Sequence, residues 1–307
     1  MPKNKDVQKK ERKPRNKKAI IISISVTLVC VIIGGVGGYF IGKQVFPQND
    51  AIDYSKMKDK DYEDDLEALM KKYTASKSSD YSTTFKPYEI ANIGIEKIKN
   101  HDYVVSKTIG LVKAAGVDQT VRASSIKHKN DLFLENISAS SMVKTGKRFY
   151  QSNGVVKTYN GNNIETDKAK WDEQPTSELS LDEHEEKWGK NLSRPLIYII
   201  SSKTCFDTST ATKTNDGYEV RLDLSPKYAV LRYVRQMVEI SPVKNPRFHS
   251  IQLTMNLDNE LNLLSCAVDE SYSVEMVITA ESVAHLDEVY TYDVETPIPS
   301  LNENLMY

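Results

Sequence analysis

The chain has 307 residues, of which 41 are Lys or Arg and 42 are Asp or Glu. Residues 1–18 hold nine of the basic residues and two of the acidic ones, so the remainder carries 32 basic and 40 acidic residues, a net charge of about −8. An acidic remainder is a poor binder of polyanions, which argues against nucleic acid as a partner.

An uncharged run from Ala19 to Gly42 follows the basic residues. It contains 24 residues, and a helix of that length spans the hydrocarbon core of a bilayer, about 30 Å thick. The run is longer than the apolar region of a secretory signal peptide and has no small-residue cleavage site after it. The sequence therefore predicts a signal anchor: one transmembrane helix at 19–42, a cytoplasmic tail at 1–18, and an extracytoplasmic remainder in a bacterial cell envelope.

Two further patterns near the membrane favour self-association. Gly34, Gly38 and Gly42 recur on one face of the predicted helix, a spacing that lets two membrane helices approach closely, although glycine is also common in such helices generally. In the segment 43–86 we expect a short stalk helix with one apolar seam, then a Ser/Thr-rich linker at 74–84. The seam consists of Tyr62, Leu66, Leu69 and Tyr73.

The C-terminal region, 87–307, is predicted to be one domain. Pro87 suits the first turn of a helix that runs to about Asn100. Apolar and polar residues then alternate after Tyr218, Ile251 and Tyr272, which is typical of strands in an antiparallel sheet with one buried face. Weaker strand candidates are Val104–Lys113, Gln119–Lys129, Asp131–Ser140 and Lys147–Tyr159.

Two later helices interrupt these strands. Ser180 and Glu183 have the spacing of a capping box, which predicts a helix to about Lys190. Ser225 and Pro226 precede a second helix, Lys227–Ile240, with a wide apolar stripe. The stripe consists of Val230, Leu231, Val234, Met237 and Val238. The elements together predict an α+β domain in which helices lie against a long antiparallel sheet.

Residues that would indicate catalysis are scattered. None of the five histidines belongs to a metal-binding or nucleophile motif, and the acidic run around His184 would point in all directions around a helix. We therefore expect no enzyme, no metal and no cofactor, although forty acidic residues leave a hydrolytic carboxylate pair open. Cys205 and Cys266 would lie in an oxidising compartment, where they either pair or remain two buried thiols.

The order of elements resembles the LolA/LppX-like superfamily of envelope lipid and lipoprotein carriers. The resemblance covers residues 88–295. It lies in the helix from Pro87 and in the segments Gln119–Arg122, Gly146–Tyr150, Val155–Tyr159, Ile251–Leu257 and Leu261–Val268. The resemblance implies a curved, half-barrel-like sheet under helices that holds acyl chains or acts as a sensor domain, without catalytic residues. Those carriers are usually soluble or lipid-anchored, so a helical tether favours local presentation, sensing or scaffolding over shuttling.

Two hypotheses follow. In the first, the helices cover a cavity, and the stripe on 227–240 contacts a hydrophobic ligand, a lipid or a lipidated peptide. In the second, the protein is an interaction subunit of an envelope assembly, secretion or signalling complex, dimeric through the glycine face and the stalk. Helices that pack flush on the sheet and leave no cavity are the alternative to the first hypothesis.

Overall fold

The computed structural model describes residues 54–114, 117–141, 144–188, 192, 194–240, 244–275 and 279–303. The predicted cytoplasmic tail, the transmembrane helix at 19–42 and the glycine face formed by Gly34, Gly38 and Gly42 lie outside these residues. Within the described ranges, no helix is both long enough and apolar enough to cross a membrane.

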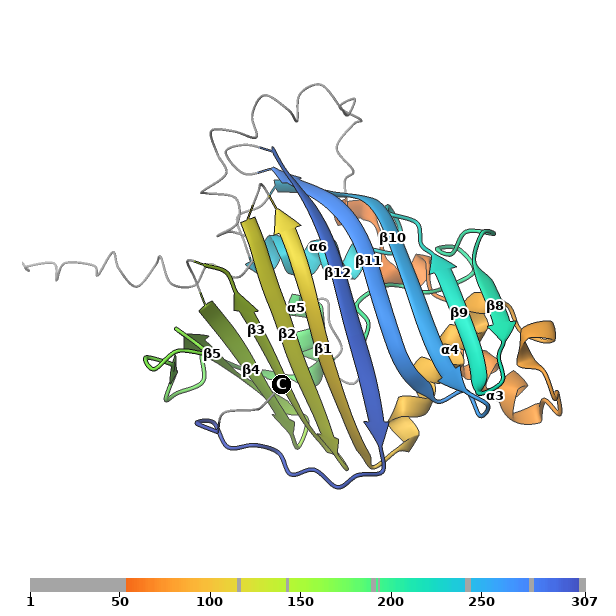
Figure 1. The fold of residues 1–307 in the computed structure, drawn as a ribbon, viewed down its shortest axis with the longest axis horizontal. Helices are drawn as coiled ribbons and strands as arrows, with labels where there is room; N and C mark the ends of the chain where they lie inside the picture. The colour runs from red at the N-terminus through yellow and green to blue at the C-terminus, as the bar shows by residue number, and fades with distance from the viewer. Residues whose placement is uncertain are drawn as a thin grey trace, which may run out of the picture.

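A single antiparallel sheet of twelve strands dominates the fold, and it is curved and not closed into a barrel (Figure 1). The strands are β1 (Tyr103–Ala114), β2 (Val117–His128), β3 (Asp131–Ala139), β4 (Lys144–Ser152), β5 (Val155–Asn162), β6 (Lys170–Trp171), β7 (Ser177–Ser180), β8 (Thr210–Lys213), β9 (Gly217–Asp223), β10 (Lys244–Asp258), β11 (Leu263–Glu275) and β12 (Thr279–Tyr292). Their order is β6-β5-β4-β3-β2-β1-β12-β11-β10-β9-β8, and β7 pairs with β5. The first and last long strands therefore meet in the middle of the sheet.

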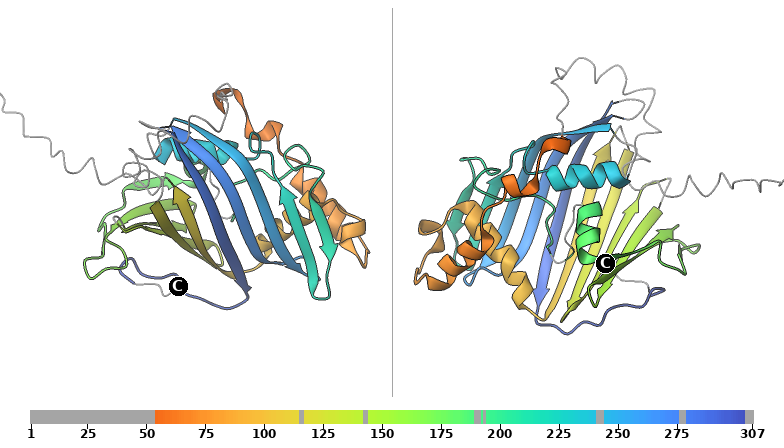
Figure 2. Two further views of the ribbon diagram at one scale, coloured as in Figure 1. Left: turned by 45° about the horizontal axis from the view of Figure 1, so that its top comes forward. Right: turned by 180° about the vertical axis from the view of Figure 1, so that it is seen from behind.

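Four helices lie on one face of the sheet, which we call the inner face (Figure 2). They are α3 (Leu66–Ala75), α4 (Pro87–Lys97), α5 (Leu181–Trp188) and α6 (Leu231–Ile240), accompanied by the short 3-10 turns η1 (Tyr54–Lys56), η2 (Asp59–Asp61), η3 (Tyr81–Thr83) and η4 (Ile98–Asn100). The main core fills the space between these helices and the inner face of β9, β10 and β11. A smaller core under α5 consists of Leu132, Leu134, Phe149, Val156 and Leu192.

The predicted α+β class and antiparallel sheet are confirmed. The helix from Pro87 forms, and the Ser180–Glu183 capping box forms with its two backbone contacts, Ser180 N to Glu183 Oε2 at 2.9 Å and Glu183 N to Ser180 Oγ at 3.3 Å. The helix predicted from Lys227 begins instead at Leu231, because 227–230 form a turn. Four strands were not predicted: the short β6, β7 and β8, and the central β12.

The segment 54–86, expected to be a stalk and a linker, packs against the rest of the domain. Leu69 of α3 is buried in the main core together with Phe85. The Tyr73 hydroxyl donates to the carbonyl oxygen of Glu260 at 2.9 Å, and the backbone N–H of Ser202 donates to Asp64 at 2.6 Å. Leu66 and Tyr73 of the seam that suggested a stalk pack against the main core beside Leu69.

The two cysteines of the described domain are free thiols. Burial raises the pKa of Cys205 to about 12, and burial also raises the pKa of Cys266, which lies in the main core. Cys266 is buried, whereas Cys205 is only partly buried.

Candidate ligand-binding cavity

The apolar stripe on α6 packs into the protein interior. Val230, Leu231, Val234 and Met237 are all buried, and three of them belong to the main core. The side chain of Val238 lies outside the described residues. None of these four residues lines the cavity under α6, and their burial holds the helix on the sheet. The residue of α6 that faces a cavity is Tyr233.

A cavity of about 160 Å³ lies between α6 and the inner face of the sheet. Tyr233 borders it on the helix side, and four neighbouring strands supply the rest of the lining. The strand residues are Val112 and Ala114 of β1, Gln119 and Val121 of β2, Glu270 and Tyr272 of β11, and Ser282, Ala284 and Leu286 of β12. The lining is mostly apolar, with one carboxyl group among it.

Small side chains on the sheet leave the room for this cavity. On β12, Ser282 and Ala284 face inward opposite Tyr272 and Glu270 of β11. On β1, Gly110 pairs with Leu286, and a Cβ at that glycine would lie only 2.1 Å from the Leu286 Cδ2 atom. Glycine therefore allows Leu286 to lie against β1. Larger residues at Ser282 or Ala284 would fill the space.

Glu270 is the acidic group of the cavity, and it is almost completely buried at 3% exposure. Two tyrosines donate to its two oxygens: Tyr198, from the loop before α6, donates to Oε2, and Tyr233 donates to Oε1 at 3.1 Å. Burial raises the pKa of Glu270 to about 7, against the partly compensating effect of the two hydrogen bonds. Burial likewise raises the pKa values of Tyr198 and Tyr233, so both remain protonated donors.

No cation among the described residues compensates this carboxyl group: no Lys, Arg or His contributes to its pKa. The Gln119 amide, another polar group of the lining, donates to the Ser138 hydroxyl. When Glu270 is ionised, its negative charge therefore lies in mostly apolar surroundings. The two neutral tyrosine hydroxyls stabilise that charge by donating hydrogen bonds. Such a carboxyl group is well placed to interact with whatever enters the cavity.

Sequence reasoning missed Glu270 and Tyr233, although a signal for Glu270 exists. It precedes Tyr272 and Val274 by two and four residues, so it falls on the inward side of the same alternation. A charged residue in a buried register is unusual and points to a special environment. Tyr233 shares a helix with the apolar stripe, but nothing in the spacing of that helix separates it from core residues.

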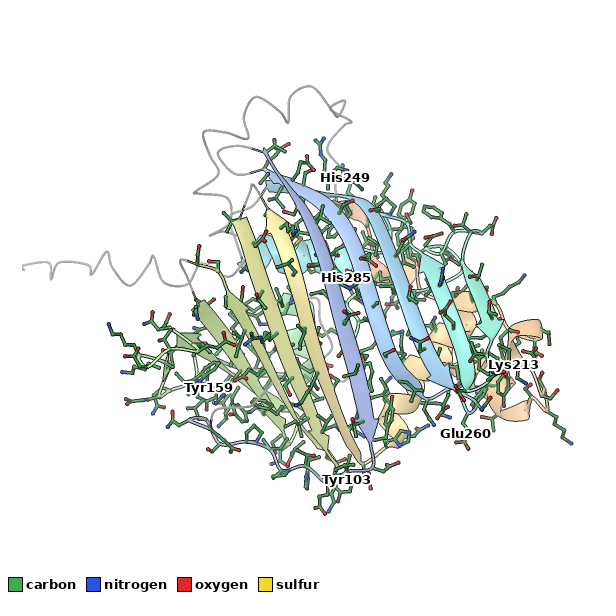
Figure 3. The ribbon with its side chains drawn as sticks, viewed as in Figure 1. Tyr103, Tyr159, Lys213, His249, Glu260 and His285 are labelled. Carbon is green, nitrogen blue, oxygen red and sulfur yellow. The ribbon has the colours of Figure 1, made fainter. Side chains whose placement is uncertain are left out.

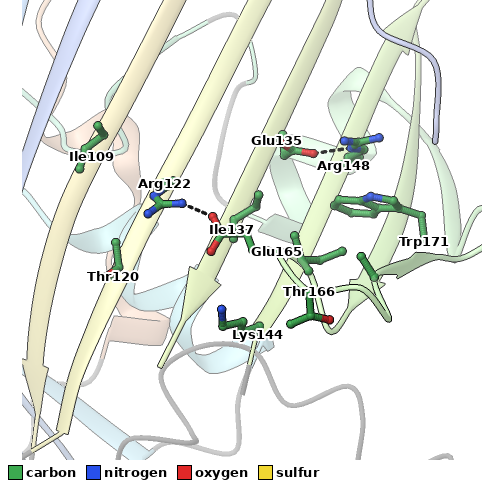
Figure 4. A pocket seen from close by; sticks show the side chains of 12 residues that line it. Ile109, Thr120, Arg122, Glu135, Ile137, Lys144, Arg148, Glu165, Thr166 and Trp171 are labelled. Atoms are coloured by element: carbon green, nitrogen blue, oxygen red, sulfur yellow. Dashed lines mark hydrogen bonds and ion pairs between the residues drawn. The ribbon is translucent and has the colours of Figure 1, made fainter. Parts of the chain in front are cut away.

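A larger groove of about 690 Å³ lies on the opposite, outer face of the sheet (Figure 4). Four of its charged residues form two ion pairs, Arg122 with Glu165 and Arg148 with Glu135, and Lys144 also lines the groove. Trp171 lies 4.2 Å from the Arg148 guanidinium.

A small polar cluster lies on the outer face around His285 of β12. His285 contacts Asp269 at 2.7 Å and Asp287 at 3.1 Å on this face (Figure 3), and the hydrogen bond from Asp269 raises the pKa of His285. Across the described ranges, no group of three or more His, Cys, Asp or Glu residues could hold a metal ion.

No family model matches the chain, and no curated protein matches it. Among solved structures, it is similar to a DUF1329 family protein from Desulfovibrio piger, with 10% sequence identity, a TM-score of 0.26, and coverage of 69% of this chain and 93% of that chain. A likeness at this score carries no argument about function, and the resemblance to LolA/LppX-like carriers stays an expectation from the sequence.

Proposed function

We propose that this protein is a membrane-anchored, non-enzymatic binding protein that holds a hydrophobic group between α6 and the inner face of the sheet. The observation that carries the proposal is the mostly apolar cavity of about 160 Å³ under α6. Apolar cavities of about 150 Å³ stay free of water and bind benzene or xenon. The cavity therefore suits a ring or a short alkyl segment.

The size of the cavity limits what enters it while α6 stays in place. A complete lipid or a lipidated peptide would place only one end of its apolar part here, and a longer buried stretch would need α6 to move away from β10 and β11. The predicted helix at 19–42 would keep the site beside the membrane, where such ligands are concentrated.

Ligand-dependent stabilisation tests this proposal. The full chain in lipid nanodiscs is heated with and without toluene, an uncharged probe of suitable size. At a free toluene concentration ten times Kd, binding stabilises the folded state by about 1.4 kcal/mol, which corresponds to a rise in Tm of about 3–6 °C for a domain of this size.

A matched pair of variants locates the binding. Ala284→Leu fills the cavity and is expected to abolish the rise in Tm, whereas Val283→Leu, on the outer face and 59% exposed, is expected to keep it. Absence of any rise in the unaltered chain, or a full rise in Ala284→Leu, contradicts the proposal.

A second candidate function, that of an interaction subunit in an envelope complex, is favoured by the outer face. Ile109 of β1 and Val289 of β12 are more than half exposed there, as is Val283, and β1 and β12 are neighbours.

Crosslinking in native membranes distinguishes contacts through this surface from contacts through the predicted glycine face. If copies of the protein contact through the sheet, Val283→Glu should reduce the crosslinked species. If they contact through the membrane helix, Gly38→Ile should reduce it. The absence of a crosslinked species in the unaltered chain and in both variants contradicts both contacts.

A further inference from the structure

We propose that Glu270 selects the ligand, and that the cavity under α6 takes an apolar group ending in a positively charged hydrogen-bond donor, namely an alkyl or aryl ammonium. This inference rests on the proposed function, since it names the chemical class that the same cavity binds.

The carboxylate of Glu270 has unused capacity to accept hydrogen bonds. A carboxylate has about four positions at which it accepts hydrogen bonds, and two of these are taken by the hydroxyls of Tyr198 and Tyr233. Both hydroxyl protons are thereby committed to Glu270. The remaining capacity of the carboxylate consists of acceptor positions, so Glu270 matches a ligand group that donates and not one that accepts.

Burying a carboxylate without a cation is costly, and attraction between opposite charges is several times stronger in a protein interior than in water. Among the described residues, no basic side chain supplies that cation. A ligand ammonium would bring the missing charge together with three donors. A ligand carboxylate would be repelled, and an alcohol would supply one donor without charge.

The cavity is bounded by Val112, Val121 and Ala284 on the sheet side, and its volume of about 160 Å³ accommodates about six carbon atoms, as in benzene. An ammonium on a short apolar body therefore meets two complementary surfaces at once, the apolar lining and the carboxyl group.

Three ligands of equal length test the inference on the full chain in nanodiscs of zwitterionic lipid at pH 8: n-hexylammonium, 1-hexanol and hexanoate. Calorimetry, corrected with empty nanodiscs, measures each Kd. We expect hexylammonium to bind at least tenfold more tightly than hexanol, and hexanoate not to bind detectably. In Glu270→Gln, hexylammonium should lose this advantage while hexanol binds within about threefold of its original Kd.

The control variant removes the same charge from the opposite face. Asp269 precedes Glu270 on β11, and its side chain is exposed on the outer face. Asp269→Asn should keep the full preference for hexylammonium. If both variants lose the preference equally, long-range charge explains it, and Glu270 is not the selecting group.

A comparison without substitution covers the case in which Glu270→Gln does not fold. The titratable groups that face Glu270 are Tyr198 from the loop, Tyr233 from α6 and Tyr272 on its own strand, and tyrosines titrate near pH 10. Between pH 8 and pH 5.5 only the carboxyl group among these gains a proton, because its pKa is about 7. The advantage of hexylammonium over hexanol should therefore shrink at pH 5.5.

The outcomes separate this inference from the proposed function. Equal binding of hexanol and hexylammonium to the unaltered chain overturns the inference and leaves a hydrophobic site. Preference for hexylammonium that persists in Glu270→Gln also overturns it. If neither these ligands nor toluene bind, the proposed function fails and the inference fails with it.

Discussion

Arg148 is the clearest case in which single contacts decide a local structure. It is 1% exposed and pairs with Glu135, which is equally buried. Its other nitrogens donate to backbone carbonyl oxygens of the C-terminal segment, including Glu303 at 2.6 Å from Nη2 and Ser300 at 3.3 Å from Nη1. The Arg148 side chain thus holds residues 300–303 against the outer face. Leu301 packs against the small apolar cluster that contains Trp171.

Replacing Arg148 by Met should destabilise the domain by about 3–5 kcal/mol, because the carboxylate of Glu135 would remain buried without its partner. Urea unfolding of the full chain measures the loss. Arg122→Met is the control: Arg122 also pairs with a glutamate, but its side chain is 36% exposed, so the expected loss is below about 1 kcal/mol. Equal losses in the two variants contradict the assigned role of Arg148.

Glu270 gives the fold a specific dependence on pH. Its pKa in the folded state is about 7, above the ordinary value of 4.5, so between these values the folded state binds more protons than the unfolded one. The free energy of unfolding should therefore fall as pH rises from about 4.5 to 7, by roughly 3 kcal/mol in total. The contribution is present at low pH and lost above pH 7.

Denaturant unfolding of the unaltered chain and of Glu270→Gln at pH 5 and pH 8 isolates this contribution from those of other carboxylates. The difference in free energy between the two proteins should shift in favour of Glu270→Gln at pH 8. A constant difference across this range would show that Glu270 titrates alike in the folded and unfolded chains.

At the scale of elements, strands and helices differ in how well the sequence predicts them. Strands β9 and β10 have large apolar residues at every second position, and they were predicted from that alternation. Strand β12 alternates just as regularly, but its inward residues include Ala280, Ser282 and Ala284. Small residues give a weak hydrophobic signal, so β12 was not predicted. The same small residues leave the space that forms the cavity.

Helix α3 illustrates a different difficulty. Its apolar seam was predicted from spacing, but spacing alone does not tell whether such a seam faces a second helix or the chain's own sheet. The contacts of Tyr73 with Glu260 and of Asp64 with Ser202 join residues 138 or more positions apart. A local sequence pattern does not predict contacts between residues so far apart in the chain.

Leu69→Ala tests whether α3 belongs to the domain. If α3 packs in the core as described, the variant should lose about 2–5 kcal/mol of folding free energy. A helix that forms an independent stalk would show almost no loss. Lys71→Ala, whose side chain is 74% exposed in the same helix, should change stability by less than about 0.5 kcal/mol; thermal and urea unfolding of the full chain measure both.

At the scale of the whole molecule, the curved sheet and the helices on its inner face produce the site. Pairing of β1 with β12 brings residues from both ends of the domain to the same place, and α6 covers them. The α+β class was predicted from periodicity, whereas the strand order and the meeting of Glu270, Tyr198 and Tyr233 depend on the tertiary fold. The outer face differs from this site because it carries paired charges.

The central claim is that a hydrophobic group binds inside the domain, between α6 and the sheet. Nuclear Overhauser contacts from bound toluene to labelled methyl groups of the full chain test it most directly. The account predicts contacts with the methyl groups of Ala284 and Val112, which line the cavity. Contacts only with Ile109 and Val283, which are exposed on the outer face, or no contacts at all, would contradict it.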